Sequence, residues 1–220
     1  AASDVYKRQV YEDKNFQDKL KDAATSIKVG SVWEAGNVVG PMITNRNDKL
    51  LQALTLEPGE SWLVPPKFID EKQYILAPTV KWGVKPGSYS FRTELFGPML
   101  SVACIDNLQQ GIELVNSLDY GLTSGLQSLD ENEQKLWKDS ILAGNLYINR
   151  GITGAIVNRQ PFGGMKLSAF GGGVKAGGPN YCACLVKITD KPESNTDYKQ
   201  SYPHAYEEEF AHARDINKLY

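Results

Sequence analysis

Cysteine and histidine are scarce in this 220-residue chain. The cysteines are Cys104, Cys182 and Cys184, and the histidines are His204 and His212. An odd number of cysteines without framework spacing argues against a disulfide-stapled fold, and these residues lack the spacing of metal ligands. We therefore expect no bound metal and, by default, a reducing compartment such as the cytoplasm, with a mitochondrial location left open.

The sequence also has no excess of charge and no long apolar run. Its formal net charge is −2, with 41% hydrophobic and 23% charged residues, which is an ordinary globular composition. This balance gives no reason to expect a nucleic acid as partner. No run approaches the roughly 18 apolar residues of a membrane span. A Walker loop, a G-x-S-x-G elbow and an H-E-x-x-H motif are absent too.

Apolar periodicity predicts alternating strands and helices. Met99 to Ile105 is predicted as a strand, followed by a helix, a short strand in "YGLTSGLQS", a helix from Asp130 to Ala143 and the strand "NLYIN". This succession is the βαβ pattern of an α/β fold with a mixed, largely parallel sheet and flanking helices. Further helices are expected over Asn15 to Gly30 and Asp48 to Leu56, and "YCACLVKI" is expected as a last strand.

The first nine residues, "AASDVYKRQ", differ in pattern from everything that follows. They resemble translated sequencing-adapter read-through, and the chain does not begin with Met. We expect residues 1–9 to be a non-native leader that takes no part in the fold. The alternative is a genuine disordered start.

None of the cysteines has the surroundings that activate a thiol nucleophile. Cys104 lies within the apolar run "MLSVACI", so we expect it to be buried and inert. Cys182 and Cys184 alternate on one face of the expected last strand, with no neighbouring base. The sequence therefore offers no catalytic cysteine.

The stretch "TELFGP" sets a carboxylate beside an aromatic ring just before a forced turn. Glu94 and Phe96 precede Gly97-Pro98, and such a pair suits a sugar hydroxyl next to a flat ring. The alternative is a solvated glutamate and a core phenylalanine at the entry of a strand. Spacing alone favours this plainer interpretation, because so short a motif is weak.

A second candidate site is the glycine-rich stretch "NRGITGAIVNRQPFGG". It leaves a predicted strand, and sites in α/β proteins are usually built at the carboxyl ends of strands. Gly154 and Ala155 are small enough for a ligand to approach the backbone, where successive N–H groups can hold a carboxylate. Phe162 sets an aromatic ring nearby. A structural loop whose glycines serve only positive φ explains the stretch equally well.

Three of these motifs occur in the order typical of one enzyme family. "TELFGP", "NSLDYGLTSGLQS" and "GNLYINRGITGAIVNRQPFGG" together resemble the C-terminal half of an aldehyde dehydrogenase. "LEPGESW" and "VKWGVKPGSYSFRTELFGP" narrow the resemblance to the 1-pyrroline-5-carboxylate (glutamate-γ-semialdehyde) dehydrogenases. The resemblance covers about Val10 to Lys187. The tail from Ser201 resembles longer members, some of which are bifunctional proline-utilisation proteins.

The resemblance implies a reaction and a role for each candidate residue. Members of this family oxidise glutamate γ-semialdehyde to glutamate with NAD, in proline catabolism. By resemblance, Glu94 binds the ribose hydroxyls beside the nicotinamide, and Phe96 packs against the nicotinamide. Gly154 and Ala155 donate backbone N–H bonds to the substrate carboxylate. Phe162 lines the aliphatic part of the substrate.

The resemblance also implies what is missing. In the family, the nucleophilic cysteine, the general-base glutamate, the oxyanion-hole asparagine and the dinucleotide-binding domain all lie upstream of the matching stretch. We therefore expect this chain alone to be inactive, and its parent to be a homodimer or higher oligomer.

The expected layout is a leader (1–9), a partial catalytic domain (10–180), an oligomerisation strand (181–190) and a polar extension (191–220). Two alternatives stay open. One is another semialdehyde dehydrogenase of the superfamily, and the other is a non-catalytic dimerisation or interaction module.

Overall fold

The computed structural model describes residues 2–43, 48–70, 74–153, 159–170, 174–178 and 181–187. The chain divides into two compact units, Ala1–Tyr181 and Cys182–Tyr220. The helices are α1 (Arg8–Glu12), α2 (Lys14–Ser26), α3 (Asp48–Ala53), α4 (Tyr89–Arg92), α5 (Leu108–Asn116), α6 (Glu131–Ser140) and the 3-10 helix η1 (Tyr181–Leu185). The strands are β1 (Ala2–Lys7), β2 (Ser61–Val64), β3 (Phe68–Asp70), β4 (Ile75–Leu76), β5 (Thr79–Trp82), β6 (Met99–Ile105), β7 (Tyr120–Gly121), β8 (Thr123–Leu126), β9 (Asn145–Ile148) and β10 (Met165–Lys166).

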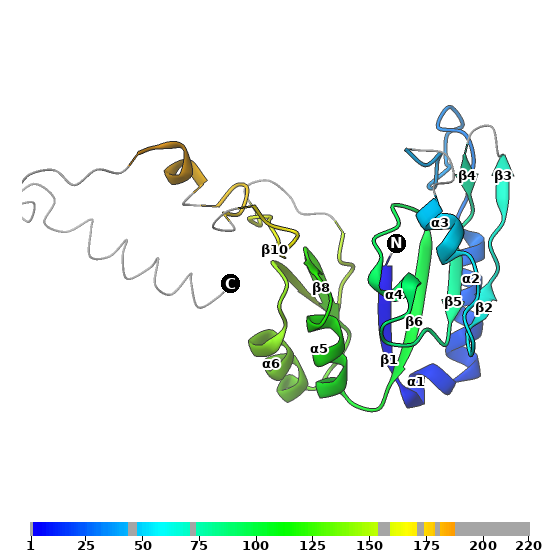
Figure 1. Ribbon diagram of the computed structural model, residues 1–220, viewed down its shortest axis with the longest axis horizontal. Helices are drawn as coiled ribbons and strands as arrows, with labels where there is room; N and C mark the ends of the chain where they lie inside the picture. Colours follow the sequence, from blue (N-terminus) through cyan, green and yellow to red (C-terminus); the bar gives the residue numbers. More distant parts are fainter. Residues whose placement is uncertain are drawn as a thin grey trace, which may run out of the picture. The chain divides into compact units, whose positions relative to one another are not determined.

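The main sheet has four strands in the order β1-β6-β5-β2 (Figure 1). Strand β6 pairs in parallel with β1 on one side and with β5 on the other, and β2 closes the sheet antiparallel to β5. Strand β6 has the bounds predicted from the sequence, because a strand covered on both faces is a nearly continuous apolar run. The mixed, largely parallel α/β sheet is thus confirmed.

Strand β1 corrects the expectation that residues 1–9 take no part in the fold. Its residues pair in register with residues 100–105 of β6. Val5 packs against the cluster of Val84, Phe91 and Ala103, while Tyr6 packs against the opposite face of the sheet. The prediction relied on unusual composition, whereas strand pairing requires only backbone groups and side chains that alternate between the faces. The origin of the segment stays a prediction.

Helix α2 covers one face of the main sheet. Asp13 caps its first turn by accepting a 2.9 Å hydrogen bond from the Asn15 amide. Its apolar side packs on a core formed by residues of β2, β5 and β6, with aromatic contacts at its entry, where Tyr11 stacks on Trp82 at 4.6 Å between ring centroids. The predicted helix over residues 15–30 is therefore present but ends at Ser26.

Helices α3, α4 and α5 cover the opposite face. Residues Ala53 of α3 and Tyr89 of α4 pack with Leu95 and Met99, and Leu114 of α5 packs with the neighbouring cluster around Ala103. The side chains that β5 and β6 direct to this face include Lys81 and Ser101, both 1% exposed. The sheet is therefore sandwiched between helices, and the buried polar side chains of β5 and β6 face α3, α4 and α5.

Strands β8 and β9 form a second, separate parallel pair with α6 between them. Trp137 of α6 and Ile141, which follows α6, pack with Ile112 of α5 to cover this pair. The strand and helix order predicted from Met99 to Asn149 is present, but its first strand does not pair with the other two. Strand β6 pairs with β1 and β5 instead of β8, because partners from distant parts of the sequence compete for the same strand edges.

No helix in the described part of the chain has the length and hydrophobicity to cross a membrane.

The segment that the sequence predicts as the last strand forms a 3-10 helix, η1, instead. Its backbone bonds locally, since the Val186 amide donates to the carbonyl of Ala183, so the strand expected here is wrong over Tyr181–Leu185. A role of residues 181–190 in oligomerisation stays a prediction.

Strand β1 carries a carboxylate whose ionisation opposes folding. Burial raises the pKa of Asp4 from its ordinary value of 3.8, although the Tyr6 hydroxyl donates a 2.8 Å hydrogen bond to Asp4 that acts in the opposite direction. Because the folded state holds the proton more tightly, stability declines as the pH rises from about 3.8 through the raised pKa. Asp4→Asn should therefore increase the melting temperature at pH 7 by roughly 2–4 °C, the shift that about 1 kcal/mol produces in a domain of this size.

Thermal denaturation followed by circular dichroism checks this expectation. The gain should disappear as the pH falls below 3.8, where the parent carboxyl becomes protonated in both states. Asp22→Asn, an exposed change on α2, is the matched control and should leave the melting temperature unchanged. A gain of the same size for Asp4→Asn at every pH would contradict the explanation.

Candidate functional site

The loop between α4 and β6 carries the first pair of predicted site residues. Leu95 is 2% exposed, and its neighbours Glu94 and Phe96 both face solvent, with Phe96 69% exposed. Three consecutive side chains thus alternate outward, inward and outward. The predicted core phenylalanine is therefore wrong, and the residue in the core is Leu95. The loop lies at the amino end of β6, opposite to the strand ends where sites of parallel sheets are usually found.

Phe96 adopts a strained backbone conformation. Its φ is 48°, in the left-handed region that a bulky side chain rarely occupies. Its two flanks are fixed: Leu95 is buried with Met99, and the amide of Thr79 donates a 2.9 Å hydrogen bond to the carbonyl of Pro98. Strain of this kind costs on the order of 1–3 kcal/mol and is concentrated at ligand-binding positions.

This loop can therefore present a hydrogen-bond acceptor and a flat apolar ring to a ligand that approaches from solvent. A carboxylate at Glu94 can accept bonds from vicinal hydroxyls, and the ring of Phe96 can cover a planar heterocycle. The exposed pair fits the ribose and nicotinamide of a dinucleotide. No residue in the described part of the chain covers the ring of Phe96 completely, so most of the dinucleotide contacts would come from elsewhere.

The second predicted segment, around Phe162, is held in place by backbone contacts. The Phe162 amide donates to Ala176 over 3.0 Å, and the Ala176 amide returns a bond of 2.8 Å. Buried Asn145, at the start of β9, donates to the carbonyl of Pro161 and accepts from the amide of Gly163. One side chain thus fixes both sides of Phe162, which is half-buried. The described hydrogen bonds and ring contacts do not join Phe162 to the loop that carries Glu94.

Close backbone contact also fixes the two glycines after Phe162. A Cβ on Gly144 would overlap the carbonyl oxygen of Gly163, so the two backbones touch where a side chain would not fit. The ammonium group of Lys175 donates to the carbonyl of Gly144, and burial lowers the pKa of this lysine. The glycines of "QPFGG" therefore serve close approach rather than free bending.

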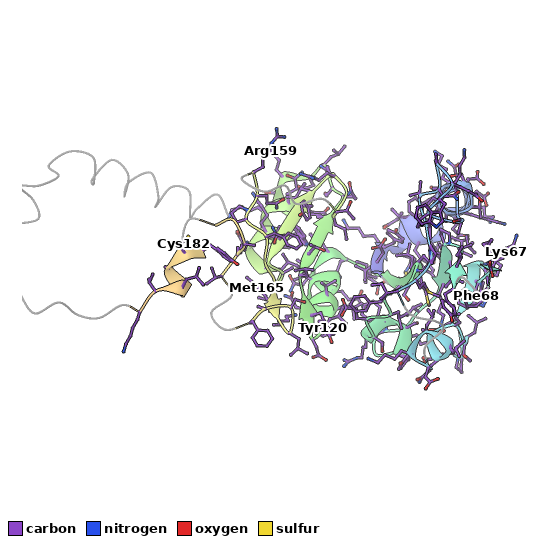
Figure 2. All side chains as sticks on the ribbon, turned by 90° about the horizontal axis from the view of Figure 1, so that it is seen from above. Lys67, Phe68, Tyr120, Arg159, Met165 and Cys182 are labelled. Atoms are coloured by element: carbon purple, nitrogen blue, oxygen red, sulfur yellow. The ribbon has the colours of Figure 1, made fainter. Side chains whose placement is uncertain are left out.

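The beginning of the loop is anchored by Asn149. Its φ is 55°, a conformation that asparagine tolerates, and its side chain makes two 2.9 Å hydrogen bonds with the backbone of Ser128. Arg150 then lies over the ring of Tyr147 at 5.0 Å. Gly154 and Ala155 lie outside the described residues. Beyond these residues, the side chain of Arg159 is exposed (Figure 2).

The cysteines behave as the sequence predicted in one respect only. Burial is the main cause that raises the pKa of Cys104, against an opposing effect of Arg8, so its thiol is not activated. The expectation that Cys104 is fully buried is wrong, because its side chain is partly exposed. Cys182 is an exposed free cysteine on η1 rather than on a strand. Within the described residues, histidine, cysteine and carboxylate side chains form no group that could hold a metal.

Sequence reasoning missed a buried pair of opposite charges. Lys81 of β5 and Glu60 form an ion pair at 3.0 Å, and both side chains are 1% exposed. The signal that could have revealed it is the lysine in "PTVKWG", since a charged residue within an otherwise apolar buried strand requires a partner.

Comparison with known proteins identifies the class to which this fold and these motifs belong. The model described as "Aldehyde dehydrogenase family" matches residues 4–189. The chain therefore belongs to the aldehyde dehydrogenase family, and the resemblance predicted from its motifs is confirmed.

Individual relatives show a more specific similarity within this family. A 1-pyrroline-5-carboxylate dehydrogenase of Bacillus licheniformis is 33% identical over 181 residues, which are 80% of this chain and 35% of the relative. Among solved structures, proline utilization A from Corynebacterium freiburgense is 42% identical with a TM-score of 0.75, over 87% of this chain and 21% of that chain. The 1-pyrroline-5-carboxylate dehydrogenase from Thermus, solved with bound NAD, is 30% identical with a TM-score of 0.71, over 83% and 35%. The chain thus spans about a third of the length of such a dehydrogenase.

The contact between Gly144 and Gly163 gives a prediction for stability. Gly144→Ala should lower the free energy of unfolding by roughly 1–3 kcal/mol, because the added methyl group displaces the backbone that carries Phe162. Urea denaturation followed by tryptophan fluorescence measures the change. Gly151→Ala is the control, because the nearest atom to its added Cβ is the Thr153 hydroxyl at 4.0 Å. Equal losses for both variants would contradict the assigned contact.

Proposed function

We propose that this chain is the larger part of the catalytic domain of an NAD-dependent enzyme that oxidises L-glutamate γ-semialdehyde to L-glutamate. The observation that carries the proposal is the strained loop that exposes Glu94 and Phe96 around buried Leu95. Support also comes from the relatives named 1-pyrroline-5-carboxylate dehydrogenase and proline utilization A. Glutamate γ-semialdehyde is the open-chain form of 1-pyrroline-5-carboxylate, so the proposed reaction belongs to proline catabolism.

The proposed division of roles follows the chemistry of the two segments. Glu94 accepts hydrogen bonds from the ribose hydroxyls of the cofactor, and Phe96 covers the nicotinamide ring. Bound NAD supplies a hydride acceptor. The amides of Gly154 and Ala155 bind the substrate α-carboxylate, and Phe162 lines the aliphatic part of the substrate. These groups bind and orient the reactants, which brings the aldehyde carbon and the nicotinamide into reacting distance.

The nucleophile of the reaction is proposed to come from the part of the enzyme that this chain lacks. In the proposed reaction a thiolate would add to the aldehyde carbon, bound NAD would supply the hydride acceptor, and water would cleave the resulting thioester. Neither Cys104, with its raised pKa, nor exposed Cys182 has an activating base in the described structure. We further propose that the complete enzyme is a homodimer or a higher homo-oligomer.

The purified 220-residue chain should therefore produce no NADH from pyrroline-5-carboxylate and NAD above the rate of a protein-free blank. Absorbance at the NADH maximum measures the product. Turnover above the blank would contradict the proposal. If a thiol-alkylating reagent then abolished that turnover, one of the three cysteines of the chain would be acting as the nucleophile.

The substrate role is tested in a full-length protein that contains this sequence. The protein should oxidise glutamate γ-semialdehyde with a higher kcat/KM than an aldehyde of the same length that lacks the α-carboxylate. Ala155→Asp should raise KM for the semialdehyde by at least about tenfold, since like charges set against each other cost several kcal/mol. Steady-state kinetics with each aldehyde measure both effects.

Ala155→Asn is the control, because it has the same size without the charge. An unchanged KM in Ala155→Asp would leave the glycine-rich stretch with a structural role only. A full-length protein that prefers the aldehyde without the carboxylate would instead favour another semialdehyde dehydrogenase.

A further inference from the structure

The buried ion pair between Lys81 and Glu60 is linked through Trp62 to the hydrophobic cluster that contains Leu95, the buried residue of the loop that exposes Glu94. We propose that this pair is a positioning device, which holds the loop in the conformation that presents Glu94 and Phe96 to the cofactor. The inference rests on the proposed function of that loop. It concerns residues that do not themselves reach the exposed side of the loop, since both are 1% exposed as side chains.

A chain of hydrogen bonds leads from Lys81 to the helix that precedes the loop. The carboxylate of Glu60 accepts the ammonium group of Lys81 at 3.0 Å and also accepts the amide of Glu57 at 2.8 Å. The Glu57 side chain then accepts the amide of Tyr89 at 3.1 Å, at the first residue of α4. Helix α4 is a single turn that ends at Arg92, two residues before Glu94. The position of α4 therefore sets where the loop begins.

A second route runs through packing. Lys81 lies over the ring of Trp62 at 5.4 Å, and Trp62 packs against the cluster that contains Leu95, Met99 and Tyr89. Leu95 is the buried residue that separates Glu94 from Phe96. The ammonium group also donates a 2.8 Å bond to the carbonyl of Thr55, just after α3. Lys81 is thus linked both to α4, which leads into the loop, and to Leu95, the hydrophobic anchor within the loop.

The cost of the pair supports a role beyond stability. Removing two charges from water costs several kcal/mol, and apolar replacements of similar volume are often as stable. One oxygen of Glu60, Oε1, is buried without a hydrogen-bond partner in the described part of the molecule. An arrangement that served stability alone would be served as well by apolar residues, whereas fixed orientation requires directional bonds.

Hydrogen exchange of the chain itself, measured by mass spectrometry, tests the proposal without any ligand. Lys81→Met should accelerate exchange across residues 89–96 by roughly tenfold, the change expected when an opening becomes easier by the 1.4 kcal/mol of about one hydrogen bond. Exchange across residues 123–126 and 145–148, in the other parallel pair, should remain unchanged. Lys175→Met is the matched control, since it removes a half-buried lysine whose partner is Gly144.

Two further variants keep the test decisive if Lys81→Met fails to fold. Glu57→Ala removes the last link to Tyr89 and keeps the ion pair, so it should also accelerate exchange across residues 89–96. Glu60→Gln leaves the buried ammonium group of Lys81 without a counter-charge, so it should accelerate exchange there at least as much as Glu57→Ala. Unchanged exchange in residues 89–96, or a uniform increase that includes residues 123–126, overturns the proposal.

In the full-length protein, Lys81→Met should raise KM for NAD and leave KM for the aldehyde unchanged, as Glu94→Ala should. This comparison separates the two proposals. If Glu94→Ala has no effect on KM for NAD, the assigned function of the loop fails. If Glu94→Ala raises that KM and Lys81→Met does not, the positioning role fails alone.

Discussion

The pairing of β6 with a parallel strand on each side is the constraint on which the main sheet depends. A strand with both edges paired and both faces covered must be apolar along its length, and "MLSVACI" satisfies this requirement. The strand also fixes the loop that precedes it, because Met99 belongs to the same buried cluster as Leu95. The exposed positions of Glu94 and Phe96 follow from this anchoring, since their side chains alternate with that of Leu95.

The two candidate segments are built on different physical principles. The loop of Glu94 is anchored by buried Leu95 and stores strain at Phe96, and we propose that a buried charge pair positions it. The segment of Phe162 is held by backbone contact between glycines and by the two hydrogen bonds of Asn145. Rigid support of both kinds suits residues that orient reactants, because orientation is lost when a binding loop is free to move.

Local sequence pattern predicted many of the helices and strands. It failed for segments whose conformation depends on a partner that is distant in the sequence. The strand over Met99–Ile105 was confirmed to the residue, and the helix before Gly30 to within a turn. Residues 2–7 were assigned to no element, yet they supply an edge strand because β6 has an edge to pair with. Residues 181–185 were assigned to a strand, yet they form a 3-10 helix. Each error has the same cause, since the energy of a strand comes from its neighbour and not from its own sequence.

The sequence by itself determined the family, because motif order along the chain requires no knowledge of contacts, and the family model over residues 4–189 confirmed it. It also determined which short stretches carry the candidate site. Only the tertiary structure decided that Leu95 is the anchor and Phe96 the exposed ring. Only the tertiary structure brought Lys81 of β5 together with Glu60, which precedes β2. The physical reason is that burial is a property of the assembled core. A charge in a strand shows that a partner is needed, but only the fold shows which residue meets it.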